Sequence, residues 1–364
     1  MSVTPNNLVA YGSANMPEAD GVIVGGAVDL TISVAFYDIS PSGAVDWVSS
    51  SAADTATKAQ IAGRDTTGAI QTPAAITLNG RTPVTGSQTF ERLLYGIITG
   101  AVAGSFPLAN PGGTAAVGDV ACFAHAATIS AHTAQAGSAN TSGTTPPLFK
   151  LQAGDGASVS AGMIIRLTGG TDQYEIRQIV ATSGYGADVV AVNRDWTTVP
   201  DATTTYNVNE GMLFPISPNA VTKVTRCFAT SAADVPTGAA RYFFEKVFAV
   251  NNNTATALTG AQIEIASETP SLPSGALLDI GLCTALNDTN TCNPRQQASS
   301  FVPTGCGAFV TQPALISVPS PGNLPSGATP NIAGAQGVWL RLTLPAGTAA
   351  YKGAADLRVQ GTTT

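Results

Sequence analysis

Alternation of apolar and polar residues, repeated along much of the chain, is the feature that most restricts its fold. Between Ala27 and Tyr37 the larger apolar residues occupy every second position, and small or polar residues lie between them. Successive side chains of a β-strand point to opposite faces, so this period of two indicates a half-buried strand. The same alternation returns in residues 338–344, and residues 242–250 predict a further strong strand with Phe244, Phe248 and Val250 on one face. We therefore predict an all-β chain whose main domain is an antiparallel β-sandwich.

Small residues and turn formers separate these strands. The 364 residues include 38 glycines and 23 prolines, and hydrophobic residues make up 44% of the chain although aromatic residues make up only 6%. Charged residues are 11% of the total, against roughly 25% in a typical soluble domain. This composition favours many short strands joined by many turns. With few surface charges to keep it apart from its neighbours, such a chain suits a packed assembly.

The stretch of residues 59–100 predicts a meander of three or four antiparallel strands. Residues 74–79 alternate, and Asn79-Gly80 is a dipeptide that favours a tight hairpin turn. A second turn is expected at residues 64–68, where Gly68 is free to adopt a left-handed conformation. None of the side chains in this meander forms a pair with an evident catalytic role.

A change of character after residue 100 predicts an inserted unit. Residues 101–147 are small, polar and turn-forming, which is typical of a functional loop or of a linker into an insertion. Three short apolar strands are expected to follow, and the earlier pattern resumes near residue 219. A chain of this length holds two or three domains. We predict a discontinuous β-sandwich domain of residues 1–105 and 219–364, and an inserted small β-barrel domain of residues 106–218.

The polar, glycine-containing residues 1–26 predict an extended N-terminal arm. Residues 1–20 are expected either to lie across a neighbouring subunit, by adding to a sheet edge, or to be a free terminus. On either alternative, deletion of residues 1–20 would leave the isolated protein folded.

Charge and hydropathy argue against two classes of partner. The net charge of −7, the pI near 4.7 and the lack of any Lys/Arg run disfavour nucleic acid. No stretch reaches the roughly 18 apolar residues of a membrane helix, so no membrane partner is predicted. The first residues show neither a basic nor an apolar region typical of a signal peptide, so folding in the cytosol is expected.

The five cysteines are not arranged as a C-x-x-C motif. Cytosolic synthesis disfavours disulfides during folding. Cys283, Cys292 and Cys306 lie in a loop-rich segment, where a late bridge between Cys283 and Cys292 or between Cys292 and Cys306 could staple the loop. Buried thiols and a zinc site are the alternatives for these three residues. Cys122 and Cys227 complete the set.

The sequence predicts neither a zinc site at its histidines nor a calcium loop. His125 and His132 are seven residues apart, whereas zinc-binding histidines on one helix are four apart, and no third ligand is near in sequence. Residues 154–156 and 287–290 resemble fragments of calcium loops, but neither offers the full spacing of oxygen ligands. Turns explain both stretches.

An enzyme is not predicted either. The chain has no nucleophile elbow, P-loop or dinucleotide fingerprint. Glycoside hydrolysis needs two carboxylates, for which Asp188 with Asp195, or Glu175 with Asp195, are the candidates. Tryptophans that stack on sugars would support them, but each tryptophan falls inside or beside an expected strand, where core packing explains it. These residues are Trp47, Trp196 and Trp339. No catalytic, cofactor-binding or metal-binding residue is therefore predicted.

Three segments carry a resemblance to virus proteins. Residues 63–94, GRDTTGAIQTPAAITLNGRTPVTGSQTFERLL, resemble a segment of structural proteins of tailed bacteriophages. Residues 241–248, RYFFEKVF, followed by three asparagines, resemble a strand of the same group. Residues 161–196 resemble small β-barrel modules inserted in phage tail and capsid proteins.

This resemblance implies a virion component without enzymatic activity, assembled in the cytoplasm of a host bacterium. A capsid decoration (cement) protein of the head shell is the first expectation. A tail, neck or baseplate component, including a receptor-binding adhesin, is the alternative. The implied partners are the major capsid protein or other virion proteins, and the implied assembly state is a homo-oligomer, with a trimer as the first expectation.

Overall fold

The computed structural model confirms the all-β prediction. It describes residues 3, 7–16, 22–99, 120–135, 140–144, 146–170, 173–214, 221–228, 237–269, 271–327, 334–348 and 353–363. Within these ranges the regular structure consists of β-strands and one short 3₁₀ turn, η2 (Asp155–Ser158). The chain divides into two compact units: an outer unit of Met1–Asp38 with Thr225–Thr364, and an inserted unit of Ile39–Val224.

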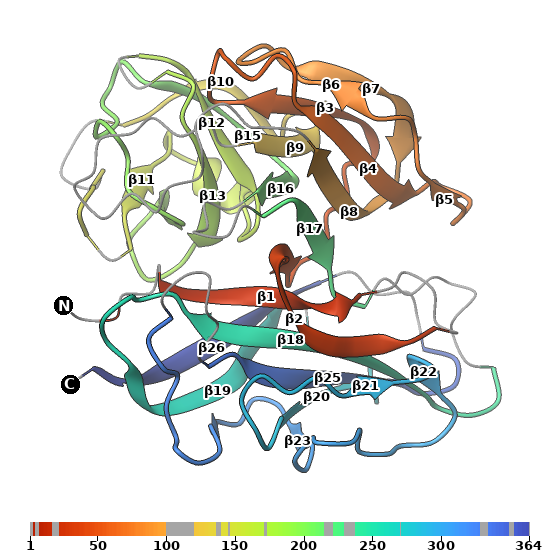
Figure 1. Ribbon diagram of the computed structural model, residues 1–364. Coiled ribbons are helices and arrows are strands. Elements are labelled where there is room, and N and C mark those ends of the chain that lie inside the picture. The colour runs from red at the N-terminus through yellow and green to blue at the C-terminus, as the bar shows by residue number, and fades with distance from the viewer. Residues whose placement is uncertain are drawn as a thin grey trace. The chain divides into compact units, whose positions relative to one another are not determined.

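The outer unit is an antiparallel β-sandwich (Figure 1). Its second sheet is formed by β24 (Ile316–Ser317), β19 (Leu258–Thr269) and β26 (Ala354–Thr363), in that order. Two short strands, β21 (Thr291–Cys292) and β22 (Gln296–Gln297), pair with β2 (Val24–Ala35) and β18 (Arg241–Asn251) of the first sheet, respectively. The first sheet has the order β23 (Val310–Thr311), β20 (Leu277–Leu282), β25 (Gln336–Leu344), β18 (Arg241–Asn251), β1 (Leu8–Asn15) and β2 (Val24–Ala35).

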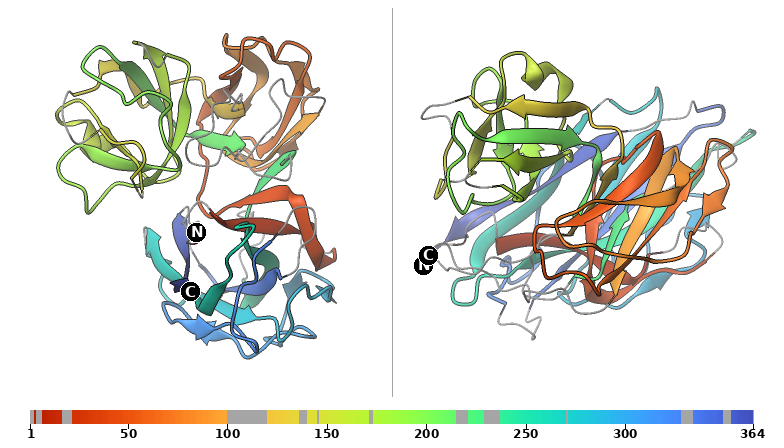
Figure 2. Two further views of the ribbon diagram at one scale, coloured as in Figure 1. Left: turned by 60° about the vertical axis from the view of Figure 1, so that its left-hand side comes forward. Right: turned by 90° about the horizontal axis from the view of Figure 1, so that it is seen from above.

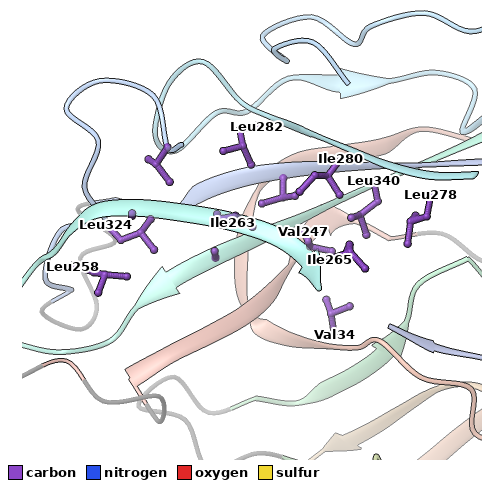
Figure 3. Packing of buried hydrophobic residues seen from close by; sticks show 14 of the residues in the cluster. Val34, Val247, Leu258, Ile263, Ile265, Leu278, Ile280, Leu282, Leu324 and Leu340 are labelled. Carbon is purple, nitrogen blue, oxygen red and sulfur yellow. The ribbon is translucent and has the colours of Figure 1, made fainter. Parts of the chain in front are cut away.

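The core of this sandwich follows from the alternation of side chains along its strands. Val247 of β18 and Ile280 of β20 point from the first sheet toward Ile263 and Ile265 of β19, and all four are buried (Figure 3). Burying one such side chain stabilises the fold by about 1.5–3 kcal/mol, so this burial stabilises the packing of the two sheets against each other. Figure 3 also labels Val34, Leu258, Leu278, Leu282, Leu324 and Leu340 of the same cluster.

The inserted unit contains two sheets that face each other and a third, curled sheet, which we call the half-barrel (Figure 2). One facing sheet is β16 (Gly211–Phe214), β9 (Val120–Ala124), β3 (Gly43–Ser49) and β7 (Val84–Phe90). The other has β8 (Arg92–Thr99), β4 (Lys58–Arg64) and β5 (Ile70–Gln71), with β6 (Ile76–Thr77) also on β4. The half-barrel is β10 (Ile129–Thr133), β15 (Thr205–Asn209), β12 (Ile164–Gly169), β13 (Ile176–Ala181), β14 (Val189–Val192) and β11 (Leu148–Lys150). Strand β17 (Lys223–Arg226) spans the junction of the two units in the sequence.

Aromatic packing explains the two parts of the inserted unit. The rings of Trp47 and Phe214 lie 5.7 Å apart, between the facing sheets. Gly96 of β8 lies directly against this packing. A Cβ atom added to Gly96 would lie 3.2 Å from each of the two rings and 2.8 Å from the sulfur of Met212. Inside the half-barrel, Phe149 packs on Trp196 at 5.3 Å and on Tyr206 at 5.1 Å; two of the three tryptophans thus have core positions here, and Trp339 is buried in the outer unit.

The compact units have different boundaries from the domains predicted from the sequence. The prediction placed residues 39–105 in the sandwich domain, whereas these residues belong to the inserted unit. The physical reason is strand pairing, because β3 pairs with β9 from Val45↔Ala124 to Ser49↔Val120, and β9 pairs in turn with β16. Residues 106–119, at the predicted start of the insertion, lie outside the described residues.

The prediction of a separate N-terminal arm is wrong for residues 8–15. These residues form β1, which lies between β18 and β2 in the first sheet of the sandwich. Tyr11 is fully buried, and Asn252 donates a hydrogen bond of 3.0 Å to its hydroxyl oxygen. Most of the remaining predicted arm, residues 1–2, 4–6 and 17–21, lies outside the described residues.

Candidate functional site

The two histidines do not meet. The Nδ1 atom of His125 lies 2.9 Å from the carboxylate of Asp46, and that of His132 lies 2.8 Å from the carboxylate of Asp155. Tyr206 also donates a hydrogen bond to Asp155, and burial together with that bond raises the pKa of the phenol, which keeps it protonated. Across the described ranges, no group of three histidine, cysteine or acidic side chains is placed to hold a metal ion.

The first candidate carboxylate, Asp188, anchors a turn. It accepts hydrogen bonds from the backbone amides of Gly154 (3.0 Å) and Gly156 (2.8 Å), at the start of η2. These two hydrogen bonds lower the pKa of Asp188, because they stabilise its charged form. The contacts account for the acidic residue and for the neighbouring glycines without a bound cation.

Arg177 contacts the other two candidate residues, through the carboxylate of Glu175 and the backbone oxygen of Asp195. Glu175 forms an ion pair with the Arg177 guanidinium, which also donates a 2.7 Å hydrogen bond to the backbone oxygen of Asp195. The Asp195 carboxylate accepts a 2.6 Å hydrogen bond from the amide of Gly143. Each side chain therefore fastens a loop of the half-barrel, and Asp188 is held by a different turn.

The three cysteines singled out in the sequence do come together. Cys283, Cys292 and Cys306 belong to one apolar cluster with Phe244 and Trp339, and all three are free thiols. Burial raises the pKa of Cys292 to about 11 and that of Cys306 to about 12. Thiols this basic are protonated at neutral pH and weakly reactive.

Two buried ion pairs on β18 were missed by the sequence reasoning. Lys246 is fully buried, and its Nζ lies 2.5 Å from Asp288 Oδ1. The adjacent Glu245 forms a 2.5 Å ion pair with Arg295, which is also fully buried. The signal for them was present, because Glu245-Lys246 interrupts a strand that is otherwise apolar on both faces.

A groove in the outer unit is the feature best suited to binding. It has a volume of about 450 Å³ and is lined by parts of β1, β18 and β26 together with Phe36 and Leu324. Most of its lining side chains are apolar, and Asp356 and Arg358 of β26 supply one charge of each sign. The half-buried side chains of Leu357 and Val359 line its β26 wall.

The wall formed by β26 has an open edge. Among the described strands β26 ends its sheet, with β19 on one side, and of the described residues only its first ones pair through the backbone with the chain on the other side. There, the amide of Ala355 donates a hydrogen bond to the backbone oxygen of Phe36. Amides of a strand alternate in direction, so those of Leu357 and Val359 also point away from β19. The groove therefore adjoins backbone groups that an extended peptide can pair with.

Comparison of the chain with protein-family models, with curated proteins and with the solved structures found no match. In the part of the chain that the structure describes, no helix has the length and apolar character to span a membrane.

Proposed function

We propose that this chain is a non-enzymatic structural protein of a tailed-bacteriophage virion, and specifically a capsid decoration protein that stabilises the head shell. The observation that carries the proposal is the open edge of β26 beside an apolar groove. The resemblance of residues 63–94 and 241–248 to phage structural proteins, and the low charge of the chain, support it.

An open strand edge is a liability for a protein that works alone. Its unpaired amides and carbonyls template association with other chains, and soluble proteins usually cover or charge such edges. Here the edge lies beside the half-buried Leu357 and Val359, so an added strand would cover apolar surface as well as backbone. The occupant that we propose is an extended segment of the major capsid protein.

The proposed assembly state is a homo-oligomer, with a trimer as the first expectation from the family resemblance. Completion of strand edges by neighbours would make stability depend on protein concentration. Sedimentation at micromolar concentration measures this state. A clean monomer that also fails to bind empty heads would contradict both the oligomer and the docking role.

Copy number in purified particles tests the role itself. Quantitative mass spectrometry of the virion is expected to find this chain in numbers comparable to those of the major capsid protein. A few copies per particle would instead place it in the tail, neck or baseplate, including the adhesin alternative. Complete absence from the particles would reject a virion role.

A pair of proline substitutions on β26 tests the docking edge. Proline removes one amide, and a strand tolerates it only where that amide is not paired within the sheet. Because the Val359 amide points away from β19, we expect Val359→Pro to leave the protein folded while weakening its attachment to heads. The neighbouring Gln360→Pro is the matched control, since the Gln360 amide points toward β19 and its loss should lower the melting temperature. Unchanged attachment of a folded Val359→Pro protein would show that the contact lies elsewhere.

A further inference from the structure

Cys283 and Cys306 face each other across two neighbouring backbone segments. They form an isolated antiparallel bridge, with a 2.8 Å hydrogen bond from Thr284 N to Gly305 O on one side. On the other side, Gly307 N donates a 2.8 Å hydrogen bond to Leu282 O. This bracketing defines a non-hydrogen-bonded pair, whose Cα atoms lie about 4.5 Å apart with both side chains on one face. A disulfide requires Cα atoms about 4.4–6.8 Å apart.

The positions of the two sulfurs agree with this register. An added Cβ at Gly281, two residues before Cys283 on the same face, would lie 2.6 Å from the Cys306 sulfur. An added Cβ at Gly337 would lie 2.6 Å from the Cys283 sulfur. The two glycines thus leave room for both thiols on one face of the sheet, within the same apolar cluster.

We propose that Cys283 and Cys306 are an oxidation site that closes into a disulfide when the protein meets a small-molecule disulfide such as oxidised glutathione. This pairing differs from the two bridges expected from the sequence, both of which used Cys292. Cys292 instead takes its register opposite Val24 of β2, and its thiol lies 3.3 Å from the backbone oxygen of Pro294.

The exchange balances in two steps. The thiolate of Cys306, which is half-buried whereas Cys283 is fully buried, attacks one sulfur of oxidised glutathione and releases the first glutathione thiolate. The thiolate of Cys283 then attacks the Cys306 sulfur, forms the protein disulfide and releases the second glutathione. The two protons lost by the cysteines pass to the two glutathiones. The protein cysteines are oxidised and the glutathione disulfide is reduced.

Burial sets the rate of this exchange. It raises the pKa of Cys306 to about 12 and also raises that of Cys283, and the nearby charge of Lys246 offsets part of both shifts. The thiolate is therefore scarce at neutral pH, and the reaction is expected to be slow there and faster at mildly alkaline pH. A reducing cytosol would keep the pair open, and release from the cell would allow it to close.

The disulfide would close the loop of residues 284–305. This loop carries Asp288 and Arg295, the partners of the two buried ion pairs on β18. Tying both ends of the loop together restricts the unfolded chain and holds these partners against the sheet. Its effect should therefore appear as stability of the outer unit.

The test uses the full chain, first reduced and then incubated with oxidised glutathione at mildly alkaline pH. Peptide mapping is expected to recover a Cys283–Cys306 cross-link, with a melting temperature at least about 5 °C above that of the reduced protein. The Cys292→Ser variant should form the same cross-link. The Cys306→Ser variant should form no such cross-link. Its melting temperature should be the same before and after incubation with oxidised glutathione.

Three outcomes would overturn the proposal. One is a cross-link that involves Cys292, and another is a stable glutathione adduct at Cys306 that Cys283 never displaces. The third is full alkylation of both thiols after incubation and unfolding, which would show that neither had been oxidised.

Discussion

Removal of residues 1–20 is expected to abolish folding of the outer sandwich. The deletion takes away β1, which pairs with β18 from Leu8↔Asn251 to Gly12↔Val247 and with β2 on its other side. Both neighbours would be left with unpaired backbone groups inside a sheet. The fully buried ring of Tyr11 would be lost as well. Native domains are stable by only about 5–15 kcal/mol, and these losses together exceed what such a domain tolerates.

A single substitution gives a graded form of the same test. Tyr11→Ala is expected to lower the free energy of unfolding by about 3–5 kcal/mol, the usual range for loss of a buried aromatic ring. Tyr185→Ala is the matched control, because Tyr185 keeps 37% of its surface exposed. Urea unfolding followed by circular dichroism measures both. A truncated protein that melts at the temperature of the full chain would restore the idea of a separate arm.

The long strands of the outer sandwich were predictable because their pattern is local. The apolar run over residues 242–250 marks β18, and the alternation over residues 338–344 marks β25; their observed bounds are Arg241–Asn251 and Gln336–Leu344. The predicted turn at residues 64–68 is also present: Asp65 accepts hydrogen bonds from the amides of Thr67 and Ala69, and Gly68 has φ of 85°. Such turns depend on neighbouring residues alone.

Strand β1 was missed because both of its faces are covered. Tyr11, Gly12 and Ser13 are buried in succession, so the strand shows no alternation and its small polar residues are typical of a loop. The tight turn predicted at Asn79-Gly80 is present but shifted by one residue, because Asn79 pairs with Thr82 and the centres are Gly80, at φ of 55°, and Arg81. The expected strand over residues 74–79 is reduced to β6, which pairs with β4 instead of β7.

Pairing between distant segments was not predictable from local pattern. Strand β1 pairs with β18, more than 200 residues away, and β3 pairs with β9 across the predicted domain boundary. The groove and the open edge of β26 depend on such pairing, because they exist only once the strand order is known. The cysteine cluster was predicted as a cluster, whereas its register, Cys283 opposite Cys306, also required the fold.

Substitution of Lys246 by methionine is expected to destabilise the outer unit strongly. Lys246 is fully buried, and four oxygens of Gly26, Asp288 and Asn290 lie within 3.1 Å of its ammonium. Methionine retains the apolar stem but removes the ammonium that donates to the Asp288 carboxylate and to three backbone carbonyls, so the buried carboxylate loses its counter-charge. Breaking a buried ion pair in this way costs about 3–5 kcal/mol.

The dependence on pH separates loss of the ion pair from loss of packing. Burial raises the pKa of Asp288, but the hydrogen bond and charge of Lys246, together with the hydrogen bonds from Asn290, outweigh burial, so its pKa lies below the usual 3.8. In the wild-type protein the pair therefore stabilises the fold above that value, and its contribution is lost as the pH falls through the lowered pKa. Without Lys246, two of the causes that lower the pKa of Asp288 are lost, so this pKa is higher than in the wild-type protein. Acidification then protonates the buried Asp288 carboxylate and removes the cost of burying its unpaired charge. The difference in free energy of unfolding between the wild-type protein and Lys246→Met should therefore become smaller toward about pH 4.

A double-mutant cycle completes the test. Asp288→Asn removes the charge while its amide oxygen can still accept from the Asn290 amide, as Asp288 Oδ1 does at 3.1 Å. The double variant Lys246→Met/Asp288→Asn should therefore be more stable at neutral pH than Lys246→Met alone, because no unpaired charge remains buried. Lys58→Met is the control for removal of a lysine, since Lys58 is exposed and bonds Thr77 at the surface. If Lys246→Met costs no more than Lys58→Met in urea unfolding, or if its deficit does not change with pH, the buried pair does not hold the loop of residues 284–305 against β18.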